Sequence, residues 1–70
     1  MKTLKDYIER MNEERMNLAY KYKKLAEFLR TRHDILDQTE LYLMREQERT
    51  MDNYIKILDA RIAHAMLKEQ

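Results

Sequence analysis

The chain of 70 residues contains neither glycine nor proline, and this absence limits its fold more than any other feature. Glycine and proline are the residues that most often form tight turns and interrupt helices. Residues that favour helices, such as Ala, Leu, Met, Glu, Lys and Arg, dominate the chain. We therefore expect long helices, joined by a turn that is built from other residue types.

Seam residues recur at alternating steps of three and four in both halves of the chain, which is the heptad pattern of helices that pack along a seam. The seam of the first half consists of Leu4, Ile8, Met11, Arg15, Leu18, Tyr22, Leu25 and Leu29. The seam of the second half consists of Leu41, Met44, Glu48, Met51, Ile55, Leu58, Ile62 and Ala65.

The two seams do not share a phase. If the first seam continued unbroken, polar residues such as Thr39, Glu46 and Asn53 would occupy core positions, which argues against the rival interpretation of one continuous helix. The sequence predicts an all-α fold in a single domain over residues 1–70. This fold is an antiparallel two-helix hairpin with a helix over about residues 4–31, a turn over about 32–36 and a helix over about 37–67.

Helix-start signals support these boundaries. Asp37 and Glu40 have the spacing of a capping box, and Thr3 and Asp6 repeat that spacing near the start of the chain. The pattern predicts that a helix begins at each of these two places.

A turn centred on His33 sets a register in which Ile8 faces Leu58. In this register the only charged seam residues, Arg15 and Glu48, lie in adjacent layers of facing helices. We expect a half-buried salt bridge between them, of the kind that fixes register more than it adds stability. The alternative is that Arg15 binds a ligand.

The same register predicts a ladder of polar and aromatic side chains along one edge of the hairpin. Its steps are Tyr7–Arg61, Glu14–Tyr54 and Lys21–Gln47. These pairs either hold the edge together or, joined to another subunit, form a polar pocket.

The composition argues against several function classes. Without Ser, Cys or Gly, the chain has no usual Ser or Cys nucleophile, no thiolate metal site and no glycine-rich phosphate loop. The two histidines, His33 and His64, lack the Glu-x-x-His spacing of di-iron bundles. We therefore expect no enzyme, no catalytic residues, no metal site and no cofactor.

Charge and hydropathy argue against two classes of partner. Fourteen basic and thirteen acidic residues are mixed along the chain and give a net charge of +1, whereas duplex-DNA binders carry a basic stripe. The longest apolar run, 41–44, is far below the roughly 20 residues of a membrane span. The sequence predicts a cytoplasmic protein that binds neither DNA duplexes nor membranes.

Two basic clusters adjoin tyrosines. One is the run Tyr20–Lys24, in which Lys21 and Lys24 share a helix face, and the other is Arg45 and Arg49 beside Tyr42. Tyrosine rings stack on nucleobases, while lysine and arginine bind phosphates. These clusters are either nucleotide-binding surfaces or ordinary solvated helix faces.

Apolar residues outside the seam remain without a partner in a single hairpin. They are Phe28, Leu43, Ile57, Met16, Tyr20 and Tyr42. Because an isolated two-helix hairpin also buries little apolar surface, we expect several copies to assemble into a homo-oligomeric helical bundle.

The spacing of residues on both helices resembles a family of small phage helical-hairpin proteins, found in crAss-like and other phages. This family is similar to the hairpin domain of the anti-CBASS and anti-Thoeris cyclic-nucleotide sponges. The resemblance rests on Tyr7, Arg10, Glu14, Leu18, Lys21, Lys24, Leu25, Phe28, Leu29, Gln47, Met51, Tyr54, Ile57, Leu58, Arg61 and Ile62.

The resemblance implies a phage counter-defence protein in the cytoplasm of the infected host cell. It would be a homo-oligomer that binds cyclic nucleotide signals between its subunits and sequesters them without cleavage. The residues that would bind the ligand are Tyr7, Lys21, Lys24, Tyr54 and Arg61. The alternative function is a non-catalytic coiled-coil adaptor that binds a host or phage protein.

Overall fold

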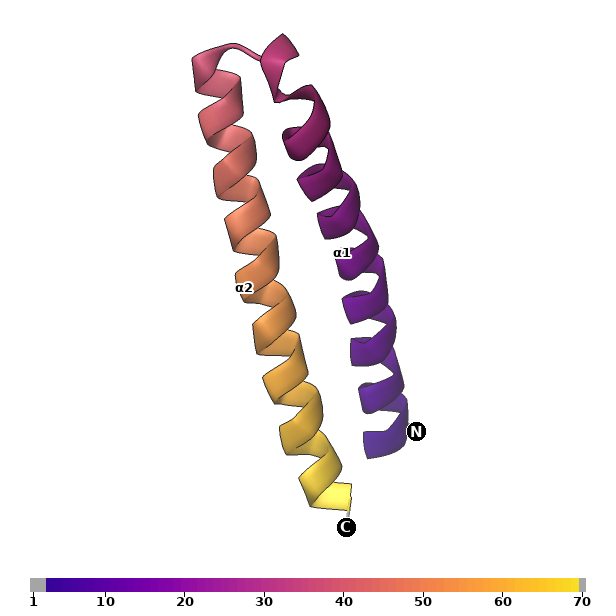
Figure 1. Cartoon of the computed structure of the whole chain (residues 1–70). Helices are drawn as coiled ribbons and strands as arrows, with labels where there is room; N and C mark the ends of the chain where they lie inside the picture. Colours follow the sequence, from indigo (N-terminus) through magenta and orange to yellow (C-terminus); the bar gives the residue numbers. More distant parts are fainter. Residues whose placement is uncertain (1–2, 70) are drawn as a thin grey trace.

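The computed structural model describes residues 3–69 as two long helices that lie side by side (Figure 1). Helix α1 spans Leu4–Arg32, a short 3-10 helix η1 spans His33–Ile35, and helix α2 spans Gln38–Glu69. The helices are antiparallel, so the first and last described residues lie at the same end of the molecule, opposite the turn (Figure 1). The predicted all-α hairpin is confirmed, with helix boundaries within two residues of those expected.

The hairpin consists of a single pair of packed helices. A helix of 32 residues is about 48 Å long at a rise of 1.5 Å per residue, and the longest dimension of the molecule is 49 Å. Because each helix packs only against the other, most of each helix surface faces outward. In the part of the chain that the structure describes, neither helix carries a stretch long and apolar enough to cross a membrane.

The predicted capping box is confirmed at α1, where both of its bonds form, and at α2 the bond to the Asp37 side chain forms. The Thr3 hydroxyl accepts a hydrogen bond from the Asp6 backbone N–H at 3.2 Å, and the Asp6 carboxylate accepts from the Thr3 N–H at 3.3 Å. At α2 the Asp37 carboxylate accepts from the Glu40 N–H at 2.7 Å. These bonds satisfy backbone donors that have no partner within the helix.

The turn reverses the chain without a left-handed residue, since no residue between 3 and 69 has a positive φ angle. The 3-10 helix η1 tightens the end of α1, and the Leu36 N–H donates to the His33 carbonyl at 3.2 Å. Leu36 then adopts an extended conformation, with φ −99° and ψ 144°. This geometry is open to any L-residue, which explains how the chain turns with no glycine or proline.

The buried apolar residues all occupy predicted seam positions. They are Ile8, Met11, Leu29, Ile55, Leu58, Ile62 and Ala65. Leu58 is the most deeply buried, with none of its surface exposed. The two heptad seams therefore identify the core correctly.

The register between the helices differs from the prediction. Ile8 and Met11 form a buried cluster with Ile62 and Ala65, whereas a turn centred on His33 would place Ile8 against Leu58. In this cluster Ile8 lies with residues that are one to two helical turns further along α2 than its predicted partner, Leu58. The reason lies in the turn, because η1 and the two residues after it move the point of reversal beyond His33.

Candidate functional site

Tyr7 and Arg61 are in contact at the end of the hairpin that holds the termini, here called the open end. The Arg61 guanidinium donates a hydrogen bond to the Tyr7 hydroxyl at 2.5 Å. Its central carbon lies 5.8 Å from the centre of the Tyr7 ring, within the range of a cation–π interaction. The predicted contact between these two residues is confirmed.

This pair borders a small hollow, the open-end hollow. Its lining residues are Leu4, Tyr7, Arg61, His64, Ala65 and Lys68, and its volume is about 260 Å³. Sites that enclose a small molecule usually measure roughly 300–1,000 Å³. The open-end hollow is therefore slightly smaller than this range.

The other three predicted ligand residues do not join this hollow. Lys21, Lys24 and Tyr54 are exposed, and the Lys24 ammonium lies 5.4 Å from the centre of the Tyr20 ring. Along α1, Lys21 lies about 21 Å from Tyr7 at the helical rise per residue. The five predicted residues therefore do not lie in one pocket, and their role in binding stays a prediction.

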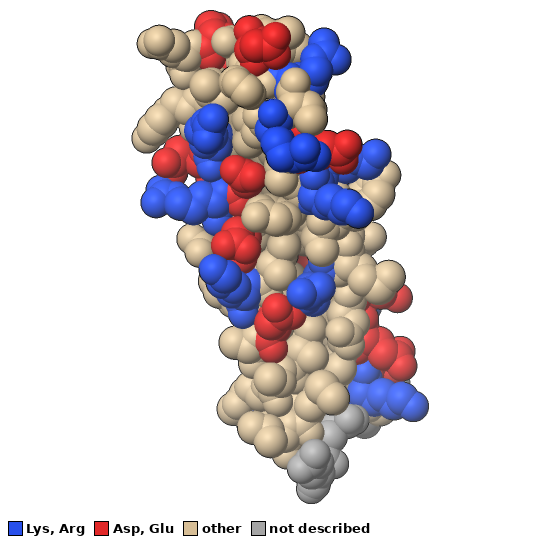
Figure 2. Space-filling model, viewed as in Figure 1, with Lys and Arg blue, Asp and Glu red and all other residues tan. Residues whose placement is uncertain are grey.

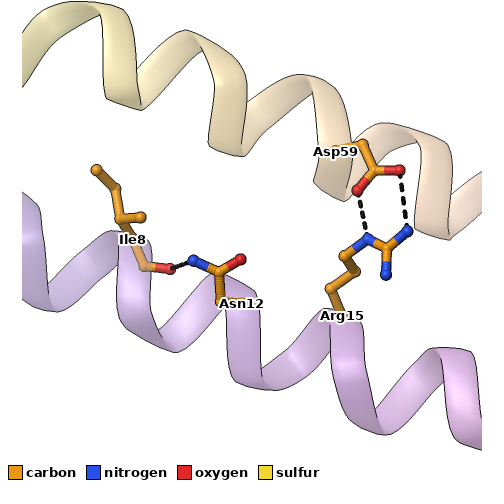
Figure 3. A network of polar contacts seen from close by, with 4 residues as sticks. All are labelled: Ile8, Asn12, Arg15 and Asp59. Atoms are coloured by element: carbon orange, nitrogen blue, oxygen red, sulfur yellow. Dashed lines mark hydrogen bonds and ion pairs between the residues drawn. The ribbon is translucent and has the colours of Figure 1, made fainter.

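Arg15 forms an ion pair with Asp59 (Figure 3). Two guanidinium nitrogens face the two carboxylate oxygens, and the Nη2–Oδ2 distance is 3.4 Å. The hydrogen bond and the charge of Asp59 raise the pKa of Arg15 above its usual value. The predicted bridge from Arg15 to Glu48 is wrong, because the displaced register brings Asp59 to Arg15 instead.

A larger hollow lies toward the turn and is here called the turn-end hollow. Its volume is about 640 Å³, within the usual size range of small-molecule sites. Its lining residues are Tyr22, Lys23, Ala26, Glu27, Leu29, Arg30, His33, Arg45 and Glu48. The hollow thus combines an aromatic ring with basic side chains from both helices.

The sequence signal for this hollow is divided between the two basic clusters. The run Tyr20–Lys24 contains two faces, and it is Tyr22 and Lys23, not Lys21 and Lys24, that line the hollow. In the other cluster, Arg49 forms an ion pair with Glu46 on the same helix, while Arg45 lines the hollow. Periodicity alone did not show which members of each cluster meet across the hairpin.

Charged side chains of both signs are interspersed on the surface. On the face shown in Figure 2, they crowd the half of the hairpin nearer the turn, whereas uncharged atoms cover most of the centre of the other half. Among the side chains of residues 3–68, no group of three or more acidic and histidine side chains is placed to hold a metal ion.

These features define a small α-helical hairpin protein with basic and aromatic hollows at both ends of its helix pair. The family model described as Sequestin matches residues 5–64. The chain therefore belongs to the Sequestin family, whose name is consistent with a sequestering function. No curated protein and no solved structure matches the chain.

Proposed function

We propose that this protein sequesters cyclic nucleotide-type immune second messengers and does not cleave them. As a phage counter-defence protein, it would keep these signals from immune effectors in the cytoplasm of the infected cell. The observation that carries the proposal is membership of the Sequestin family over residues 5–64. The family name points to sequestration, and the cyclic-nucleotide class comes from the resemblance to phage sponges.

The side chains around both hollows support a nucleotide as the ligand. At the open end, the Tyr7 ring lies beside Arg61 and near Lys68. At the turn end, Tyr22 lines a hollow together with Arg45 and other cations. Tyrosine offers a stacking surface to a base, while arginine and lysine form charge-assisted hydrogen bonds to phosphate.

The exposed surface supports assembly into a homo-oligomer. The accessible surface is 5831 Å², against about 4,700 Å² for a compact monomer of this mass. Leu43, Tyr54 and Ile57 recur at helical spacing on one face of α2, with 54%, 40% and 56% of their surfaces exposed. A second copy on this face would bury them and add walls to the open-end hollow.

The decisive experiment is to purify the protein from phage-infected cells, denature it with heat and identify the released small molecules by mass spectrometry. We expect an intact cyclic nucleotide in stoichiometric amount. Isothermal titration of the ligand-free oligomer with cyclic dinucleotides, cyclic trinucleotides and cyclic ADP-ribose isomers provides the second measurement. A folded protein that carries no nucleotide and gives no heat with any of these ligands would contradict the proposal.

Exposed apolar residues away from the seam favour a second candidate, a protein-binding adaptor. Met16, Tyr20 and Tyr42 have 69%, 63% and 62% of their surfaces exposed. A pull-down from host lysate, with the wild type and with a variant in which all three are polar, tests this function. A specific partner that the variant loses, with no nucleotide on the wild type, would favour the adaptor.

A further inference from the structure

We propose that the turn-end hollow is a guanine-nucleotide site, in which the Glu48 carboxylate accepts hydrogen bonds from the base and the surrounding cations bind the phosphates. This inference deepens the proposed function and rests on it, because it names the base and the hollow. The sequence pattern predicts neither role, since it indicates a salt bridge for Glu48 and a ligand along the edge that holds Tyr7.

Glu48 occupies an unusual position for a carboxylate. It is a half-buried carboxylate in the seam of α2, at the border of the turn-end hollow. Among the side chains of residues 3–68, the ion pairs are Arg15–Asp59, Arg49–Glu46 and Lys56–Asp52. Glu48 belongs to none of them.

An ionised carboxylate is only an acceptor, and losing water around it has a free-energy cost unless donors replace that water. Arg15, the donor expected for Glu48, instead bonds Asp59. A ligand that brings N–H donors to the seam would satisfy Glu48. A ligand that brings only anionic groups would be repelled by it.

The cations of the hollow lie at its rim, and its less exposed residues lie toward the seam. Lys23, Arg30 and Arg45 are exposed, whereas Tyr22 and Glu48 are half-buried. Negative groups of a ligand would therefore bind the exposed cations at the rim. A ring that carries N–H donors would bind toward the seam, next to Tyr22 and Glu48. A nucleotide has this division, because its phosphates lie at one end and its base lies at the other.

The geometry of a carboxylate selects among bases. Guanine presents two adjacent donors, N1–H and the N2 amino group, which match the two oxygens of one carboxylate in a pair of parallel hydrogen bonds. Adenine presents only its N6 amino group on that edge and has an acceptor at N1. Two charge-assisted bonds bind more strongly than one, so Glu48 favours guanine, with the Tyr22 ring available for stacking.

The ligand series is tested first on the wild-type protein. Isothermal titration would compare cyclic di-GMP, cyclic di-IMP, which lacks the N2 amino group, and cyclic di-AMP. We expect affinity to fall in that order, with cyclic di-AMP at least about tenfold weaker than cyclic di-GMP, because each lost donor leaves the half-buried Glu48 carboxylate with fewer hydrogen bonds in the complex. Equal affinity for all three ligands would overturn the inference, but it would not contradict the proposal that the protein sequesters cyclic nucleotides.

The variant test uses Glu48→Gln, with Glu13→Gln as the matched control on an exposed part of α1 outside both hollows. Glu48→Gln should lower the affinity for cyclic di-GMP at least about tenfold and remove the preference over cyclic di-AMP. Glu13→Gln should leave both affinities unchanged. Circular dichroism and thermal unfolding establish whether each variant is folded. If Glu48→Gln does not fold, the ligand series on the wild-type protein alone tests the inference.

The remaining outcomes separate the inference from the proposed function. If the wild type binds nucleotides and Glu48→Gln changes only thermal stability, Glu48 is a structural partner of the nearby cations and the inference is wrong. If the wild type binds no nucleotide at all, the proposed function fails, and the inference fails with it. Loss of nucleotide binding in Arg61→Gln but not in Glu48→Gln would place the site at the open end and would also overturn the inference.

Discussion

The open end and the turn end of this hairpin are built from the same two helices but differ in how tightly they pack. At the open end, Ile8, Met11, Ile62 and Ala65 form a buried apolar cluster. At the turn end, the buried residue of α1 is Leu29, and a hollow of about 640 Å³ lies beside it. The difference indicates that the two helices pack more closely at the open end than at the turn end.

The seam residues themselves cause this difference. Toward the open end, the seam of α2 reads Ile55, Leu58, Ile62 and Ala65, which pack closely because they are wholly apolar. Toward the turn, Tyr22 and Glu48 occupy seam positions, and each must keep its polar atoms near water or a partner. A polar seam residue therefore opens the interface where an apolar residue would close it.

The largest difference in stability between the two ends is expected when one seam leucine in each half is truncated. Leu58→Ala removes a side chain with no exposed surface and should lower the free energy of unfolding by about 3 kcal/mol, because it leaves a cavity in the tight half. Leu25→Ala, at a half-buried position toward the turn, should cost only about 1 kcal/mol. Urea unfolding followed by circular dichroism, at matched protein concentration, measures both.

Equal losses for the two variants would mean that the turn end is as tightly packed as the open end. That result would contradict the comparison and would argue that another copy of the chain covers the turn-end hollow in solution. Leu67→Ala, at a position of α2 that is 69% exposed, is a matched control for the loss of leucine at a site outside the seam.

A medium effect is expected from the helix caps, which differ between the two ends. Asp37→Ala removes the acceptor of the 2.7 Å bond from the Glu40 N–H and should cost about 1 kcal/mol. Thr3→Ala should cost less, because it affects a helix end that frays freely, whereas Asp37 also ends the turn. Asp37→Asn keeps an acceptor oxygen and should retain most of the stability in the same urea titration.

Equal losses of unfolding free energy in Thr3→Ala and Asp37→Ala would mean that the Asp37 cap contributes no more than an ordinary helix cap. Helix packing alone would then hold the chain in its turn. Hydrogen exchange of the Glu40 amide, which the Asp37 carboxylate protects, would report the loss of the cap directly.

Much of the fold could be predicted from the sequence because its signals are local or periodic. The helix starts at Thr3 and Asp37 follow from capping spacing, and the buried residues follow from the heptad pattern. The register could not be predicted in the same way. A shift of one heptad places similar residues opposite one another, so the choice depends on the turn, and a 3-10 turn without glycine or proline has no clear sequence signature.

The candidate site was predicted less completely for the same reason. The contact of Tyr7 with Arg61 was predicted correctly. The meeting of Tyr22, Arg45 and Glu48 around one hollow was not, because it depends on how the helices align and on which face of each helix turns inward near the turn. Residue types identified the chemistry, and only the three-dimensional structure identified which residues share a hollow.

The smallest effect is expected at the Arg15–Asp59 ion pair. Its side chains are 38% and 50% exposed, so water and salt screen the attraction. A double-mutant cycle with Arg15→Gln and Asp59→Asn should give a small favourable coupling that disappears in about 1 M salt. Urea unfolding at low and high salt measures it, and a coupling that persists in salt would contradict the prediction.

The pH dependence of this coupling follows from the direction of the pKa shift. Because Asp59 raises the pKa of Arg15 above its usual value, the stabilisation is fully present below the pKa of arginine in the unfolded chain. It is lost only as the pH rises through the higher pKa of the folded state. The coupling should therefore stay constant between about pH 6 and 9. A decrease within that range would show that another titrating group, and not Arg15, controls the pair that the displaced register brings together.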